Sequence, residues 1–262
     1  MFNKSLKNKK IIISAGASGI GLGIAKVCLD RGAYVIVTDI NCKFINNLKK
    51  KQKYKRKLFL YNFDATNEEE VNIFFKSITK KFKKFDCLIN NVGIAGPTGT
   101  LEKLSSKDWE KVLKTNVISH FYFTKLAIPL IKKNKGGTII NISSGAGVLG
   151  FPLRSPYAAS KWAVIGITKT LAMELGKNKI RVNAICPGTI KGNRMVRVIR
   201  DKAKFLKVSK KKVENDFLKM SSMNSWIYDE DIAKICAFLI SDEALRISGQ
   251  VIGVNGNEIR LD

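Results

Sequence analysis

The hydrophobic positions of the chain fall into short continuous runs that alternate with longer segments of helical periodicity. The runs are rich in β-branched residues, which is typical of strands buried on both faces. They occupy residues 10–14, 34–39, 58–63, 87–90, 138–143 and 181–185. The helical segments occupy residues 20–30, 43–51, 68–82, 107–131 and 157–175. This alternation predicts an α/β fold with a doubly wound parallel sheet and helices on both faces.

The pattern changes after Pro187. Residues 191–225 are charged and helical in periodicity, and they are followed by a predicted helix at 229–240 and a last strand near 250–254. The last strand completes a Rossmann-type sheet of about seven strands. Because the chain has no internal repeat and no linker, we expect one domain over residues 1–262, with a lobe at about 190–225.

The composition is that of a globular protein apart from its charge. Hydrophobic residues make up 45% of the 262 residues and charged residues 26%, which is close to the globular average. The formal net charge of +26 raises the question of a nucleic-acid or anionic membrane partner. The excess is mostly lysine, in dispersed runs at 49–57, 80–84, 132–135 and 210–212. We interpret these runs as solvated surface and expect no specific nucleic acid and no membrane as partner.

Neither the cysteines nor the N-terminal segment indicates a secreted or metal-binding protein. The five cysteines are scattered without a close pair, so they predict neither a zinc site nor a redox dithiol. The sequence shows no cluster of carboxylates and histidines for a metal. The apolar run at 11–25 has the look of a signal-peptide core, but glycines interrupt it as a loop requires. We therefore expect a soluble, cytoplasmic protein without a metal.

A glycine-rich turn follows the first predicted strand. Residues 15–21 read Ala-Gly-Ala-Ser-Gly-Ile-Gly and lead into the helix at 20–30. Glycines at such a turn let the backbone approach a pyrophosphate, and the free N–H groups of the helix start attract its charge. The spacing differs from the general G-x-G-x-x-G fingerprint, so a flexible strand-to-helix turn is the alternative.

Asp39 ends the second predicted strand, about 20 residues beyond the glycines. A carboxylate at this place can accept hydrogen bonds from the adenosine ribose and repels a 2′-phosphate. Ser18 and Ile40 provide no cation that could bind such a phosphate. We therefore expect NAD as the cofactor, with NADP less favoured. The alternative is that Asp39 caps the next helix.

Several motifs resemble those of the short-chain dehydrogenase/reductase family, in the same order and over almost the whole chain. Residues 14–21 are similar to the family's T-G-x-x-x-G-x-G, residues 90–93 are similar to N-N-A-G, and residues 157–161 match Y-x-x-x-K. Asn116, Ser144 and Pro187 stand where the family has its helix asparagine, its catalytic serine and its P-G pair. The chain departs from the family pattern at Ser14, Ala15, Val92, Gly192 and Asn255.

The resemblance implies an NAD(P)-dependent oxidoreductase that interconverts a secondary alcohol and a ketone by hydride transfer. It implies a catalytic tetrad of Asn116, Ser144, Tyr157 and Lys161. The implied cofactor site consists of Ser14, Gly16, Ala17, Ser18, Gly19, Ile20, Asp39, Asp64, Ala65, Asn91, Tyr157, Lys161 and Ile190. Within that set, Asp64 and Ala65 would lie beside the adenine, and Ile190 would contact the nicotinamide amide through its main chain.

Tyr157 and Lys161 are four residues apart on a predicted helix, so their side chains share one face. A phenol is too weak an acid to serve as a base at neutral pH unless a neighbouring positive charge favours the phenolate. With Lys161 beside it, Tyr157 could take the alcohol proton or return it. Ser144 would hydrogen-bond the reacting oxygen, and Asn116 would hold a water that links Lys161 to solvent.

Substrate selection is expected from the loop at 145–155 and from the segment after Pro187. These carry Arg154, Arg194, Arg197 and Arg200, in a chain that otherwise relies mostly on lysine. Guanidinium groups suit bidentate capture of carboxylate, sulfonate or phosphate. We hypothesise a small anionic hydroxy or oxo substrate, held by Arg154 or Arg194 beside Ser144 and Tyr157. A solvated helical face is the alternative.

Two other functions fit parts of the sequence. The first is reduction of 3-oxoacyl groups on acyl-carrier protein, with the basic surface receiving the acidic carrier. The expected preference for NAD speaks against this function. The second belongs to another class: a non-catalytic protein that uses the fold to bind a nucleotide or a polyanion. It would retain affinity for polyanions at physiological salt.

The resemblance also implies a homo-oligomer, a tetramer or dimer, which packs the long helices carrying Asn116 and Tyr157 against their symmetry mates. Apolar side chains on these helices could form such contacts or belong to the core: Leu113, Phe121, Phe123, Trp162 and Ile165. His120, the only histidine, is expected in the core or at a subunit contact rather than in catalysis.

Overall fold

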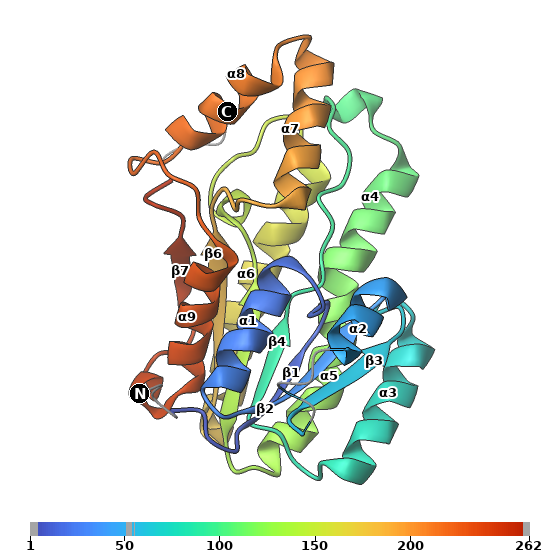
Figure 1. Ribbon diagram of the computed structural model, residues 1–262, viewed down its shortest axis with the longest axis vertical. Helices are drawn as coiled ribbons and strands as arrows, with labels where there is room; N and C mark the ends of the chain where they lie inside the picture. Colours follow the sequence, from blue (N-terminus) through green and yellow to red (C-terminus); the bar gives the residue numbers. More distant parts are fainter. Residues whose placement is uncertain (1–4, 51–53, 55, 259–262) are drawn as a thin grey trace.

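The computed structural model describes residues 5–50, 54 and 56–258. The basic N-terminal residues and the lysine run at 49–57 lie partly outside these ranges. Within them, seven strands form one parallel sheet in the order β3-β2-β1-β4-β5-β6-β7 (Figure 1). In chain order the strands are β1 (Lys10–Ile13), β2 (Tyr34–Asp39), β3 (Leu58–Asn62), β4 (Cys87–Asn90), β5 (Gly137–Ile142), β6 (Ile180–Pro187) and β7 (Val251–Val254). The predicted doubly wound parallel sheet is confirmed.

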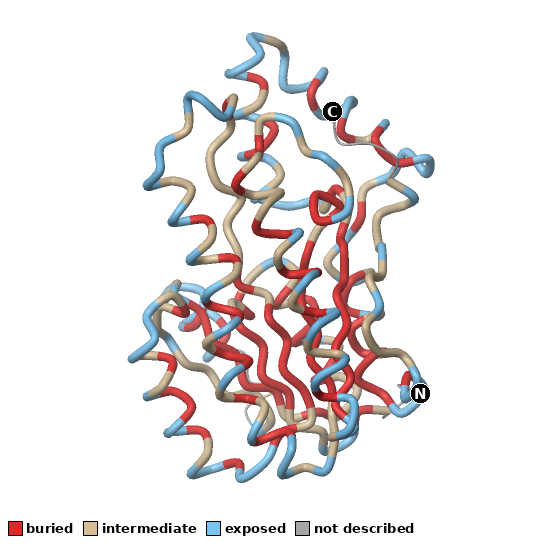
Figure 2. Tube along the Cα trace, turned by 180° about the vertical axis from the view of Figure 1, so that it is seen from behind, coloured by how far each residue is buried: buried red, intermediate tan, exposed pale blue. Residues whose placement is uncertain are grey.

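Helices cover both faces of the sheet. One face carries α1 (Gly19–Asp30), α2 (Cys42–Lys49) and α9 (Asp229–Ile240), and the other carries α3 (Glu68–Lys81), α5 (Ser119–Lys132) and α6 (Ser155–Leu175). Ile11 and Ile13 of β1 are buried on the first face, and Ile12 is buried on the second. Because successive strand residues point to opposite faces, a sheet covered on both sides needs the continuous apolar runs seen in the sequence. Figure 2 shows the buried strands between more exposed helices.

The helix predicted over residues 107–131 is divided into three parts. It consists of α4 (Ser106–Leu113), a π-helical turn (Lys114–Ile118) and α5. Such turns insert a residue into the helical repeat and are frequent at functional sites. Here the turn contains the buried Asn116. A single inserted residue leaves the hydrophobic period almost unchanged, which is why the sequence pattern does not show it.

The charged segment after Pro187 forms two helices, α7 (Asn193–Leu206) and α8 (Lys210–Lys219). They lie beyond the carboxyl ends of the strands, at the upper end of the molecule in Figure 1. Val198, Phe217 and other apolar residues of this lobe form a small core of their own, which includes Ala146 from the segment after β5. The lobe thus borders the edge of the sheet where the predicted site residues gather.

Within the described ranges, no helix combines the length and apolar character needed to cross a membrane. In the same part of the chain, no three His, Cys, Asp or Glu side chains gather in a way that could hold a metal ion.

Candidate active site

The predicted site residues meet at the carboxyl edge of the parallel sheet. Ser14 follows β1, Asp39 ends β2, Asn91 follows β4, Ser144 follows β5 shortly after its last residue, and Pro187 ends β6. In doubly wound sheets ligands bind at this edge, where the strand order reverses direction. Here the reversal lies between β1 and β4, which are neighbours in the sheet.

The glycine-rich turn presents main-chain N–H groups at the start of α1. Ser18 is the N-cap residue but makes no side-chain capping bond, and no acidic residue lies in the first helical turn. Gly19 has a φ of +48°, with no heavy atom within 4 Å of the position where a side chain would begin. Ala15 also adopts a left-handed φ, of +49°. This uncapped, open helix start fits the pyrophosphate of a dinucleotide.

Ser14 and Asn91 fasten this turn to the neighbouring strand. The Ser14 hydroxyl donates to Ile89 O (3.3 Å) and accepts from Asn91 N (3.0 Å). The Asn91 side chain donates to Ala15 O at 2.9 Å. Ser14 is 1% exposed. Both side chains therefore hold the turn in position through hydrogen bonds. The Ser14 hydroxyl is buried and does not reach the surface of the turn.

Asp39 fixes the end of β2 against the glycine-rich turn. Its two carboxylate oxygens accept hydrogen bonds from Ala17 N (3.1 Å) and Asn41 N (2.9 Å). The cap of α2 is Asn41, whose side chain accepts from Lys43 N and Phe44 N. Asp39 therefore does not cap the following helix, which was the alternative role considered for it.

The residues expected beside the adenine follow β3, and the residue expected at the nicotinamide amide follows β6, on the other side of the sheet centre. The Asp64 carboxylate accepts from both the main chain and the hydroxyl of Thr66, and the adjoining Ala65 is 9% exposed. Ile190 pairs with Ile227 through an isolated parallel bridge. This bridge holds the segment after β6 alongside the residues that precede α9.

Tyr157 and Lys161 share one face of α6, as their spacing predicts. Lys161 is 4% exposed, and its Nζ donates to Ile142 O (2.9 Å) and lies 5.7 Å from the centroid of the Tyr157 ring. Burial lowers the pKa of Lys161 to about 7, and the nearby charge of Arg194 contributes to this lowering of the pKa. Ser144 lies at the start of the short turn Gly145–Gly147, where its hydroxyl accepts from Ala146 N at 3.2 Å.

Asn116 joins the segment after β4 to α6. Its amide oxygen accepts from Ile94 N (2.8 Å), and its amide nitrogen donates to Ile94 O (3.0 Å) and Ser160 Oγ (2.9 Å). A Cβ atom added at Gly93 would lie 3.4 Å from Asn116 Oδ1 and 3.5 Å from Lys161 Nζ. The structure therefore brings Asn116 and Lys161 together beside Gly93.

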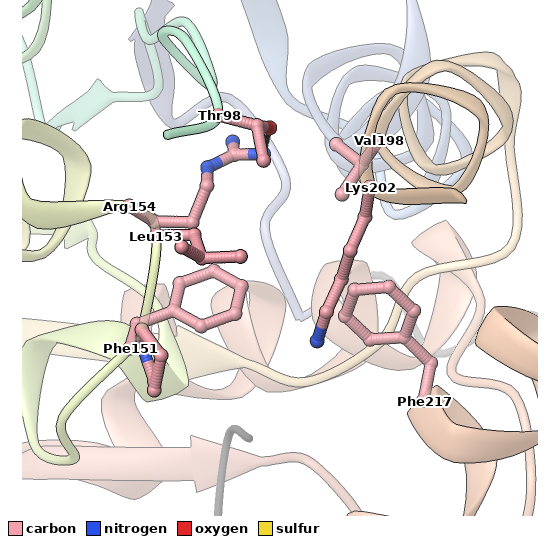
Figure 3. A pocket seen from close by; sticks show the side chains of 8 residues that line it. Thr98, Phe151, Leu153, Arg154, Val198, Lys202 and Phe217 are labelled. Carbon is pink, nitrogen blue, oxygen red and sulfur yellow. Dashed lines mark hydrogen bonds between the residues drawn. The ribbon is translucent and has the colours of Figure 1, made fainter. Parts of the chain in front are cut away.

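The two candidate anchor arginines have different surroundings. Arg154 is 5% exposed and donates to Ala95 O (2.6 Å) and Thr98 Oγ1 (3.2 Å), so it holds the loop after β4. Figure 3 shows its guanidinium directed towards Thr98, at the margin of a small pocket between the loop before α6 and the helical lobe. Arg194, by contrast, is exposed and donates to Gly93 O (2.7 Å). Arg194 therefore lies beside Gly93, close to Asn116 and Lys161.

His120 belongs to the core beneath this cluster. It is 4% exposed, and its Nε2 lies 2.9 Å from Val92 O. Because a carbonyl oxygen only accepts, Nε2 carries the hydrogen, and the buried Nδ1 has no hydrogen-bond partner among the described residues. Burial lowers the pKa of His120 to about 3, and the charge of Lys161 contributes in the same direction.

Acid is expected to destabilise the protein through His120. The folded state keeps this imidazole neutral down to about pH 3, whereas an unfolded histidine takes up its proton near pH 6.5. Between these values the unfolded state binds more protons, so the unfolding free energy falls as the pH falls. Relative to His120→Gln, the wild type should lose up to about 1.4 kcal/mol per pH unit below pH 6.5. Urea unfolding at pH 7.5, 6 and 5 measures this, and parallel curves for the two proteins would contradict it.

One residue of this region, Glu258, could not be recognised as a site residue from any sequence motif. Glu258 follows β7, and its carboxylate lies against Gly145, next to Ser144. Burial raises the pKa of Glu258 to about 7. No local motif marks this residue, because its position depends on how the segment after the last strand packs against the residues after α8.

Comparison with known proteins agrees with this geometry. A family model described as enoyl-(acyl carrier protein) reductase matches residues 14–256. The chain is 32% identical over 252 residues to the 3-oxoacyl-(acyl-carrier-protein) reductase FabG of Thermotoga maritima, with 96% of this chain and 98% of that protein covered. It is 31% identical over 264 residues to the 7alpha-hydroxysteroid dehydrogenase of Escherichia coli K12, with 99% of each covered. The solved structure of ElxO with NADP bound has a TM-score of 0.85 and 30% identity, and the match covers 95% of this chain and 98% of that one.

The chain therefore belongs to the short-chain dehydrogenase/reductase family. It is an NAD(P)-dependent oxidoreductase that acts on alcohol or carbonyl groups.

Proposed function

We propose that this chain interconverts a secondary alcohol and a ketone, with Tyr157 as the general acid and base and with Ser144, Lys161 and Asn116 supporting it. The observation that carries the proposal is the convergence of these four residues at the carboxyl edge of the sheet, beside the open start of α1. When bound, the nicotinamide accepts or supplies the hydride.

The residues present suit proton transfer at Tyr157. Lys161 Nζ brings its charge to within 5.7 Å of the centroid of the Tyr157 ring. The bond from Lys161 to Ile142 O and the burial of its chain hold that charge in place. We assign to Ser144, which follows β5 at the same edge of the sheet, the hydrogen bond to the reacting oxygen. Asn116 fixes α6 through Ser160, whose hydroxyl donates to Tyr157 O (2.7 Å).

For the cofactor, we propose NAD rather than NADP. The supporting observation is the Asp39 carboxylate at the end of β2, 8% exposed and held at the glycine-rich turn. Its neighbours Ile40, Asn41 and Cys42 carry no positive charge. A carboxylate at this place binds ribose hydroxyls and repels a 2′-phosphate.

We expect wild-type protein to bind NADH at least about tenfold more tightly than NADPH, a difference of about 1.4 kcal/mol. In Asp39→Asn the preference should shrink, because the amide keeps one acceptor for the turn but removes the charge that repels the phosphate. Fluorescence titration of the two reduced cofactors measures both dissociation constants. Asp30→Asn, on the distant end of α1, serves as the control. Equal affinities in the wild type would contradict the assignment of NAD, and tighter binding of NADPH would reverse it.

For the substrate, we propose a small hydroxy or oxo compound whose anionic group, where it has one, binds Arg194 rather than Arg154. Arg194 is exposed and lies at Gly93, close enough for its charge to act on Lys161. The Arg154 guanidinium is buried and occupied by main-chain and hydroxyl partners of the loop after β4. Arg154 thus holds the loop after β4 in position and has a structural role in the site.

A second candidate function is reduction of 3-oxoacyl groups on acyl-carrier protein. The similarity to FabG over almost the full length of both chains favours it. The two functions are separated by one panel of hydroxy acids, hydroxysulfonates, sugar alcohols and an acetoacetyl thioester, assayed with both cofactors. Turnover confined to the thioester would support the second function.

We also propose that the chain forms a homo-oligomer. Of the apolar residues considered for subunit contacts, Phe123 and Ile165 are buried in the core and Leu113 is half-buried, whereas Phe121 and Trp162 are about half exposed, at 50% and 52%. The last two lie on α5 and α6 and are the residues of this set available to a second copy.

A further inference from the structure

The Glu258 side chain comes from the segment after β7 and reaches Gly145, the residue after Ser144. After β7 the chain turns at Gly256 and Asn257, whose φ angles of +64° and +57° are both left-handed. Main-chain bonds from Ser222 N to Asn257 O (3.1 Å) and from Met223 N to Gly256 O (3.2 Å) hold this segment against the residues after α8. The backbone, not the carboxylate, therefore positions Glu258.

The Glu258 side chain is half-buried, and one of its two carboxylate oxygens lacks a partner among the described residues. Its Oε2 atom is buried without a hydrogen bond to any described residue. It fills the space beside Gly145, where the Cβ atom of any other residue would overlap it. An unpaired buried carboxylate destabilises the folded protein, and a native structure that keeps one calls for an explanation. Such exceptions concentrate at functional sites.

The surroundings indicate which chemical group would pair with Glu258. Above its pKa of about 7 the Glu258 carboxylate is ionised and only accepts hydrogen bonds, so its partner must then be a donor. Lys161 and Arg194 bring positive charge to the neighbouring site beside Gly93, and a substrate that carries an ammonium group would be repelled there. A neutral hydroxyl group donates without that repulsion. Because Ser144 and Gly145 are adjacent, with Cα atoms about 3.8 Å apart, this hydroxyl would lie close to the oxygen that Ser144 binds.

We propose that Glu258 is a specificity-determining residue that accepts a hydrogen bond from a hydroxyl group on the carbon next to the reacting carbon. The substrates are then α-hydroxy ketones and the corresponding vicinal diols. This inference rests on the proposed function, since it takes Ser144 as the residue that binds the reacting oxygen.

The test compares two ketones that differ only by a hydroxyl in place of a methyl group, 1-hydroxybutan-2-one and pentan-3-one. We expect wild-type kcat/KM to favour the hydroxy ketone by about tenfold or more, because a site built for a hydroxyl rejects the analogue that lacks it. Glu258→Leu should abolish or reverse this preference, and Glu258→Gln should keep part of it through its amide oxygen. Glu214→Leu, an exposed change on α8, should leave the ratio unchanged.

Binding is measured independently of turnover, as the rise in Tm that each ketone causes in protein saturated with oxidised cofactor. The hydroxy ketone should cause the larger rise in both the wild type and Tyr157→Phe, and the difference should vanish in Glu258→Leu. Continued turnover by Tyr157→Phe would overturn the proposed function, while the binding preference would still decide the role of Glu258. Equal responses to the two ketones, or a preference that persists in Glu258→Leu, would overturn the role of Glu258.

The stability of the variants shows that they are properly folded. Without ligand, Glu258→Leu should raise Tm by roughly 2–4 °C, because it removes an unpaired buried carboxylate from a segment held by its main chain. A fall in Tm would mean that the carboxylate serves the fold, and this result would also count against the proposal.

Discussion

Replacing Tyr157 by phenylalanine is expected to lower kcat by about 10²- to 10⁴-fold, the usual contribution of a general acid or base. The variant removes one oxygen atom and keeps the ring that contacts Arg154 and Lys161. The fold and the dinucleotide Kd should therefore stay close to those of the wild type. Absorbance at the nicotinamide band, with any substrate that the wild-type protein turns over, measures the loss.

The matched control is Tyr122→Phe, which removes the same oxygen atom from a half-buried tyrosine on α5. It should keep kcat within a small factor of the wild-type value. If both variants lose activity equally, the effect does not arise from proton transfer at Tyr157. If Tyr157→Phe remains fully active, Tyr157 is not the general acid or base.

Gly21→Ala is expected to disrupt the cofactor site and the fold around it. A Cβ atom at Gly21 would lie 2.5 Å from Ala15 O, 2.6 Å from Asn91 Nδ2 and 2.8 Å from Gly16 Cα. Because two of these contacts are with the main chain, α1 and the turn must move apart. We expect a loss of about 1–3 kcal/mol in unfolding free energy and a rise in dinucleotide Kd of about tenfold or more. Urea unfolding and cofactor titration measure the two effects.

Gly176→Ala makes the same chemical change where the structure has room for it. Gly176 has ordinary helical dihedral angles, and no heavy atom lies within 4 Å of the position that an alanine methyl group would take there. This variant should gain about 0.4–1 kcal/mol, since alanine restricts the unfolded chain. Equal stabilities for Gly21→Ala and Gly176→Ala would mean that the close approach at Gly21 does not exist.

The fold class, and a set of candidate site residues, could be predicted from the sequence alone. Strands buried on both faces require continuous apolar runs, so the parallel sheet could be predicted from hydrophobicity alone. The spacing of Tyr157 and Lys161 placed both side chains on one face of a helix, which is a local property of the chain. The glycine-rich turn and Asp39 were found for a similar reason, because strand ends at one edge of a sheet lie close together.

Tertiary structure decided the features that depend on contacts between distant segments. Arg154 and Arg194 looked equivalent as guanidinium groups, but Arg154 is buried against the loop after β4 while Arg194 lies at Gly93. The π-helical turn at Asn116 was hidden because it changes the hydrophobic period too little. Glu258 reaches Gly145 only because the segment after β7 packs against the residues after α8. Periodicity and spacing report local geometry, whereas burial and partners over long sequence separations are set only when the sheet and the lobe pack together.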